Sequence, residues 1–212
     1  ESGESLRSFK GEKRLQKILS LIKPGDFLFV EFAHNDQKPG GSHVDAFTTY
    51  KDELKFFISE ARKKGANPVL VTSMHRRRFD ENGTIINTLE DYPEAMRQTA
   101  KEENVPCIDL NAMSKILFEA LGPEKSKKAF VHHPANTFPG QTNALADDTH
   151  FSSYGAYELA RCVVEGIRLN VPELAKFLLP DIKPFDPSKP DPLEKFAVPA
   201  SKKYSLEKPA GN

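Results

Sequence analysis

The sequence predicts an α/β protein, a three-layer α/β/α sandwich in which helices cover both faces of a parallel, flavodoxin-like sheet. Two observations carry this prediction. Short apolar runs alternate along the 212 residues with longer segments whose apolar residues recur at helical spacing, an order typical of β-α-β units. The apolar runs are also continuous, as in strands that are covered on both faces, and do not alternate with polar residues.

The first half of the chain supplies two helices and two strands. Residues 10–22 place leucine and isoleucine at helical spacing, and a Lys-Pro-Gly-Asp sequence ends this helix. Residues 27–33 follow as a strand that we expect to be buried on both faces. An amphipathic helix spans residues 45–64 and ends at a Lys-Lys-Gly sequence. Residues 68–73 then form a second buried strand.

The middle of the chain continues the alternation. After a polar loop at 76–88, a proline suits the first turn of a helix over residues 92–103. Residues 105–110 predict a third strand, which is weakened by Pro106 because proline cannot donate a ladder hydrogen bond. A short helix over residues 111–121 follows.

The end of the chain predicts a loop, a helix and an arm. The loop spans residues 122–148, and the helix over 152–169 begins at serines that can cap its exposed amides. We expect residues 1–171 to form one domain. Residues 172–212 hold eight of the 16 prolines, which predicts an extended arm packed on the same domain and no second domain.

The composition excludes several classes of function. The 30 Lys and Arg residues balance the 30 Asp and Glu residues, so no net charge favours nucleic acid or an anionic membrane as partner. No apolar run approaches the roughly 20 residues that a membrane-spanning helix needs. Cys107 and Cys162 suit neither a disulfide framework nor a zinc site and are expected to be buried free thiols. We expect neither a metal nor another cofactor.

Two polar clusters occur where α/β sheets bind ligands, beyond the carboxyl ends of strands. Asn35 follows the strand over 27–33, and its side-chain amide is a donor suited to an oxyanion. Asp147 and His150 precede the last helix and can sit on one short turn. The carboxylate can then fix the imidazole tautomer while the other ring nitrogen faces a cleft. Each cluster alone is more often a turn or a cap, but both belong at the same edge of the sheet.

These blocks resemble those of a known family, the SGNH or GDSL-type hydrolases. The block at 32–37, Phe-Ala-His-Asn-Asp-Gln, is similar to the family's Gly-x-Asn-Asp block, with Ala33 at the place of the glycine. The block at 147–156, which begins Asp-Asp-Thr-His, is similar to its Asp-x-x-His block. Three further segments resemble one branch of the family, the rhamnogalacturonan acetylesterases: residues 3–9, 75–79 and 91–95.

The resemblance implies an SGNH fold and the hydrolysis of acyl esters through a serine ester, with acetylated pectic polysaccharide as the substrate. Carried over by position, the Gly3 amide and the Asn35 side chain would donate to the oxyanion. His150 would be the general base, and Asp147 would orient it. A polymeric substrate of this kind implies secretion or periplasmic export, whereas the sequence does not indicate the localisation or the oligomeric state directly.

The family's nucleophile is the serine of a Gly-Asp-Ser block that follows the first strand. The 212 residues contain no such block, since Gly25-Asp26 is followed by Phe27. The chain begins without a methionine and without a basic and apolar leader. Because the other catalytic residues are in place, we expect the first strand and its serine to be missing from this sequence and present in the natural protein. Ser73, at the end of a predicted strand, is a weak substitute.

Other functions and other residues stay open. A catalytically inactive glycan-binding protein would keep the cleft without the chemistry, and an esterase could also act on other acyl groups. Phe138 and Tyr154 are candidates for stacking on sugar rings, and residues 76–78, three arginines, for binding uronate carboxylates. For each of these residues, a purely structural position in the core or in a surface loop is the alternative to ligand binding. The pair His132-His133 lacks a third metal ligand at a recognisable spacing.

Overall fold

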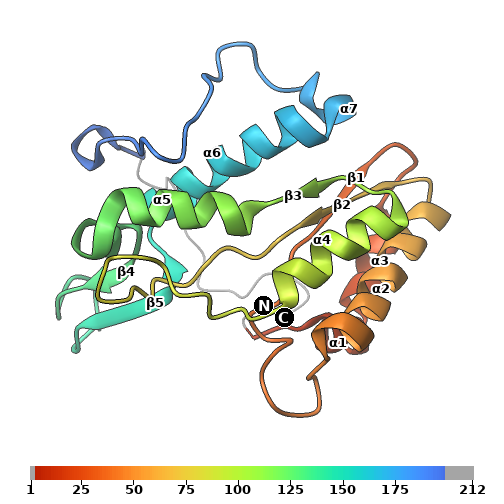
Figure 1. Cartoon of the computed structure of the whole chain (residues 1–212), viewed down its shortest axis with the longest axis horizontal. Coiled ribbons are helices and arrows are strands. Elements are labelled where there is room, and N and C mark those ends of the chain that lie inside the picture. The colour runs from red at the N-terminus through yellow and green to blue at the C-terminus, as the bar shows by residue number, and fades with distance from the viewer. Residues whose placement is uncertain (1–2, 199–212) are drawn as a thin grey trace. The chain divides into compact units, whose positions relative to one another are not determined.

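A computed structural model describes residues 3–198 of the chain (Figure 1). These residues pack into two compact units. The first unit contains residues 3–73, 91–107 and 197–198, and the second unit contains residues 74–90 and 108–196. One domain over residues 1–171, as expected from the sequence, remains a prediction.

The first unit is built on a parallel sheet. Strand β1 (Phe27–Val30) runs parallel to β2 (Asn67–Val71), and the two pair from their first residues onward. Strand β3 (Cys107–Ile108) lies on the other side of β2, where the Leu70 amide donates to the Pro106 carbonyl. The predicted α/β class and the parallel sheet are therefore confirmed. The third strand is shorter than predicted because proline interrupts the ladder beside it.

Strand β1 is shorter and more exposed than the sequence predicts. The apolar run over 27–33 indicates a strand buried on both faces, but β1 ends at Val30 and Phe29 is 36% exposed. In the sheet order of the described strands, β1 lies at the edge and has a partner on one side only. An edge strand is covered by fewer neighbours than a central one, so burial on both faces is the wrong expectation for it.

The helices of the first unit follow the predicted pattern, with one break. The single helix predicted over 10–22 is two helices, because Lys13 adopts a left-handed φ of 62° between them. Helix α3 carries acidic residues in its first turn and basic residues in its last turn, which favours the helix dipole. Both α3 and α4 contact β2 (Figure 1). The helical elements are α1 (Leu6–Gly11), α2 (Arg14–Leu21), the π-helical turn η1 (Ala46–Tyr50), α3 (Lys51–Lys63) and α4 (Tyr92–Glu103).

The second unit contains helices and an antiparallel hairpin that differs from the loop predicted over 122–148. The predicted loop over 122–148 holds β4 (Phe130–His133) and leads into β5 (Leu145–Phe151). Polar and aromatic residues follow no regular alternation there, so no period-2 pattern predicts the two strands. The helices of this unit are α5 (Leu110–Lys125), the 3₁₀ turn η2 (Ser126–Ala129), α6 (Ser153–Asn170), α7 (Pro172–Ala175) and the 3₁₀ turn η3 (Leu193–Lys195).

Helix α6 begins as predicted and is fixed in place at its first turn. The Ser152 side chain accepts a hydrogen bond from the Gly155 amide and donates one to the Lys128 carbonyl. A Cβ atom at Gly155 would lie 1.9 Å from the Ala129 carbonyl oxygen. Only glycine therefore allows the start of α6 to approach η2 this closely.

The proline-rich segment after α7 lies along α6. Arg168 donates to the Ile182 carbonyl at 2.6 Å, and the Tyr154 hydroxyl donates to the Asp191 carbonyl at 2.7 Å. These bonds join α6 to segments 14 and 37 residues further along the chain. Residues 199–212 of the predicted arm lie outside the described residues.

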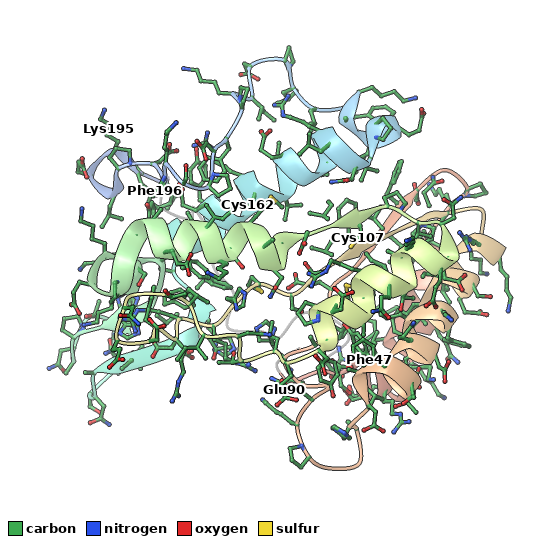
Figure 2. The ribbon with its side chains drawn as sticks, in the orientation of Figure 1. Phe47, Glu90, Cys107, Cys162, Lys195 and Phe196 are labelled. Carbon is green, nitrogen blue, oxygen red and sulfur yellow. The ribbon has the colours of Figure 1, made fainter. Side chains whose placement is uncertain are left out.

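Neither Cys107 nor Cys162, both labelled in Figure 2, forms a disulfide. Cys162 on α6 is buried, and burial raises the pKa of its thiol to about 12. Cys107 on β3 is half-buried. Within residues 3–198, no helix combines the length and the apolar composition that crossing a membrane requires.

Candidate active site

Strand β5 carries the predicted acid–base pair in an irregular stretch. Asp147 lies opposite Val131, and the next paired residue, Phe151, lies opposite Phe130. Residues 148–150 of β5 therefore have no counterpart on β4. In a regular strand, residues three positions apart point to opposite faces. The irregularity removes this constraint, so the pair meets within a strand and not on the short turn that the sequence suggested.

Asp147 and His150 are in direct contact. The Nδ1 atom of His150 lies 2.6 Å from Oδ2 of Asp147. The other carboxylate oxygen, Oδ1, accepts from the backbone amides of Thr149 at 2.7 Å and His150 at 2.9 Å. The carboxylate thus holds the ring through Nδ1 and leaves Nε2 as the nitrogen that can take a proton. The imidazole is 69% exposed, so it is presented to solvent or to a bound ligand.

Hydrogen bonding keeps Asp147 ionised. Partial burial acts to raise the pKa of this carboxyl group, but the bonds from the amide and ring of His150 and from the Thr149 amide outweigh it. The pKa of Asp147 is therefore lower than its ordinary value. An ionised carboxylate at Nδ1 stabilises the imidazolium that forms when Nε2 accepts a proton.

A second carboxylate anchors the irregular stretch of β5. Asp148 accepts at Oδ1 from Arg77 at 2.8 Å and lies 2.7 Å from Nε2 of His132. The Arg77 amide also donates to the Asp148 carbonyl, and its guanidinium reaches Ser126 Oγ and the Pro123 carbonyl. Of the three arginines considered for uronate binding, Arg77 is thus engaged inside the second unit, with only 12% of its side chain exposed. Sequence spacing offers no signal for a contact between residues so far apart.

Asn35 and its neighbour hold the segment that follows Gly3. The Asn35 side-chain nitrogen donates to the Glu4 carbonyl at 3.0 Å, while its oxygen accepts from Lys38 at 2.7 Å. One amide hydrogen of Asn35 is therefore used, and the second is available for a ligand. The buried carboxylate of Asp36 accepts from the Leu6 amide at 2.8 Å, at the start of α1. The first unit thus brings together Asn35 and the turn that begins at Gly3.

Comparisons with known proteins fit this arrangement. No protein-family model matches the chain. A rhamnogalacturonan acetylesterase of Bacillus subtilis is 50% identical to it over 167 residues, which cover 79% of this chain and 71% of that protein. The chain belongs to the rhamnogalacturonan acetylesterase branch of the SGNH hydrolases. The predicted family is therefore confirmed, and the protein is an esterase, a hydrolase that acts on ester bonds.

Two further matches support the assignment. A probable rhamnogalacturonan acetylesterase of Bacillus subtilis is 42% identical over 169 residues, or 78% of this chain and 73% of that protein. Among solved structures, the YxiM protein of Bacillus subtilis superposes with a TM-score of 0.65 at 28% identity. That match covers 79% of this esterase and 43% of the solved chain.

The four predicted site residues of the esterase fall into two pairs. Gly3 lies beside the residue that Asn35 binds, and both belong to the first unit. Asp147 and His150 contact each other in the second unit. The structure brings together the members of each pair.

The remaining candidates have other surroundings. Ser73 is buried, with 1% of its surface exposed, so its hydroxyl is not presented as a nucleophile. Nε2 of His132 lies within hydrogen-bond distance of Asp148, and the ring of His133 packs against Phe138. Within the part of the chain that the structure describes, no group of three or more His, Cys, Asp or Glu side chains is placed to hold a metal ion.

Asp36 makes the stability of the esterase depend on pH. It is fully buried, and one carboxylate oxygen has no partner among the described residues. Burial raises its pKa from 3.8 to about 6, although the Leu6 amide acts in the opposite direction. At a pH between these two pKa values, the folded protein binds more protons than the unfolded chain. The free energy of unfolding therefore falls as pH rises through this range. At about 1.4 kcal/mol per unit, the ionised form lowers stability by about 3 kcal/mol at neutral pH.

We therefore expect Asp36→Asn to stabilise the protein at pH 7.5 and to have little effect near pH 4. An asparagine keeps an oxygen for the Leu6 amide but carries no charge. Urea unfolding at both pH values measures the difference. Asp45→Asn is the matched control, because the Asp45 side chain is 76% exposed and its substitution should change stability little at either pH. A gain for Asp36→Asn that is equal at both pH values would contradict the role of ionisation.

Proposed function

We propose that this esterase removes O-acetyl groups from pectic polysaccharide of the rhamnogalacturonan type. The contact between Asp147 and His150 carries the proposal, because it supplies an oriented base with a free ring nitrogen. The substrate class rests on the relatives, since one of the two Bacillus subtilis proteins is named a rhamnogalacturonan acetylesterase and the other a probable rhamnogalacturonan acetylesterase.

The proposed reaction has two halves. His150 takes the proton of a serine hydroxyl at Nε2 while the serine oxygen attacks the acetyl carbonyl carbon. The resulting oxyanion accepts hydrogen bonds from the Asn35 side chain and the Gly3 amide. Collapse of this intermediate breaks the ester bond, and His150 returns the proton to the sugar oxygen. Water then attacks the acetyl-serine with His150 again as base, which releases acetate and restores the serine.

This scheme requires a serine that the 212 residues do not supply at a Gly-Asp-Ser block. We assign the nucleophile to a serine outside them, placed within hydrogen-bond reach of Nε2 of His150. The same proposal has Gly3, Asn35 and His150 act on one acetyl group. Asn35 already has one amide hydrogen fixed by Glu4, which supports its second hydrogen as a preoriented donor.

The test is the release of acetate from acetylated rhamnogalacturonan oligosaccharides by the complete protein. We expect release that stops when the serine of the Gly-Asp-Ser block is replaced by alanine. Binding of the oligosaccharides with no release of acetate would instead support a catalytically inactive glycan-binding protein. Faster hydrolysis of long-chain than of acetyl 4-nitrophenyl esters would contradict acetyl specificity.

A further inference from the structure

The β4–β5 hairpin has two faces with different side chains. Residues that lie opposite each other in an antiparallel pair share a face, and successive residues of a strand alternate between faces. The pairing of Val131 with Asp147 and of His133 with Leu145 places these four residues on one face. His132 projects from the other face, where it contacts Asp148. The face of the hairpin that carries Asp147 therefore also carries His133 and Leu145.

An exposed aromatic ring is held on this face. The rings of His133 and Phe138 meet edge to face, with centroids 4.9 Å apart and an interplanar angle of 79°. Phe138 is 49% exposed, and Leu145 opposite His133 is 38% exposed. The contact with His133 thus leaves about half of the Phe138 surface exposed.

The loop that carries Phe138 is organised by one side chain. Gln141 accepts from the Phe138 amide at 3.2 Å and donates from its side chain to the Pro134 carbonyl at 2.8 Å. Its backbone carbonyl accepts from the Asn136 amide at 2.8 Å. The loop therefore holds the half-exposed Phe138 ring at a defined position, where another molecule can cover it.

The residues that support Phe138 lie near the catalytic pair along this face. His133 pairs with Leu145, which precedes Asp147 by two residues. Same-face residues two apart along a strand are separated by about 7 Å, twice the rise per residue. His133, against which Phe138 packs, therefore lies one same-face position along the hairpin from the pair that contains Asp147, the residue that holds the His150 ring.

We propose that Phe138, supported by His133, is a stacking surface for a pyranose ring of the substrate chain, next to the sugar whose acetyl group reaches His150. The C–H face of a pyranose is apolar and covers an aromatic ring, while its hydroxyl groups stay in water. Leu145 extends the apolar surface beside the ring. This inference rests on the proposed function and adds to it the position at which a neighbouring sugar of the polymer is bound.

The test compares two acetyl esters in the complete enzyme. Phe138→Ala is expected to lower kcat/KM on acetylated oligosaccharides by about tenfold, chiefly through KM, the equivalent of about 1.4 kcal/mol. Hydrolysis of 4-nitrophenyl acetate, which has no neighbouring sugar, should be unchanged. Phe138→Tyr should retain the wild-type KM because it keeps the ring. Phe47→Ala, which removes a ring of similar exposure (46%) from the first unit, should change neither rate (Figure 2).

The outcomes separate this inference from the proposed function. An unchanged KM of Phe138→Ala on oligosaccharides would overturn the stacking role, as would an equal loss on both esters, which indicates a structural role for the loop. A wild-type enzyme that hydrolyses neither ester would contradict the proposed function itself.

Discussion

Replacing His150 with alanine is expected to lower kcat of the complete enzyme on acetyl esters by roughly 10²-fold to 10⁴-fold, the usual contribution of a general base. Without the imidazole, no group in contact with Asp147 can accept the serine proton, and the attack must proceed from a neutral hydroxyl. The initial rate of acetate release, measured on both 4-nitrophenyl acetate and acetylated oligosaccharide, reports the loss. Because the His150 ring is 69% exposed, its removal should leave the unfolding temperature close to that of the wild type.

Two further variants test the assignment of His150 as the base. Asp147→Asn is expected to cost nearly as much as loss of the base, because an amide in place of the carboxylate can donate to Nδ1 and fix the wrong tautomer. His43→Ala is the matched control, since His43 lies in a loop and pairs with Asp45 at 3.4 Å. It should retain the wild-type rate. Near-normal turnover of His150→Ala would dismiss this residue as the base.

Asn35→Ala is expected to lower kcat by about 10²-fold to 10³-fold, the usual effect of removing one oxyanion donor. The free amide hydrogen of Asn35 interacts with charge that develops only in the transition state. We therefore expect kcat and kcat/KM to fall together, with KM little changed. Steady-state kinetics on 4-nitrophenyl acetate measure both constants.

The structural contact of Asn35 requires its own control. The substitution also removes the bond to the Glu4 carbonyl, so thermal unfolding must show that the first unit remains folded. Lys38→Ala removes the partner of the Asn35 oxygen and leaves the donor in place, and it should reduce kcat by less than about tenfold. Undiminished turnover in Asn35→Ala would refute the role of its amide in stabilising the oxyanion.

Local sequence signals located the elements whose ends are marked by strong stop and start residues. Helix α4 begins at its tyrosine-proline pair and ends at a left-handed asparagine, and α6 begins behind its serine cap. Lys13 itself does not mark the break, because lysine is a common residue inside helices, although Gly11, the last residue of α1, lies just before it. The hairpin β4–β5 was missed because its pairing joins residues across a loop, and each strand alone lacks a clear period.

The sequence by itself determined the α/β class, the parallel pairing of the first two strands and the Asp-x-x-His pair, because these depend on apolar periodicity and on residues close together in the chain. The tertiary structure decided how that pair meets, since an unpaired stretch of β5 lets residues three positions apart face each other. It also decided that Arg77 and His132 hold Asp148, and that Asn35 binds Glu4. Such contacts depend on how distant segments fold back on one another, which no local pattern of residues records.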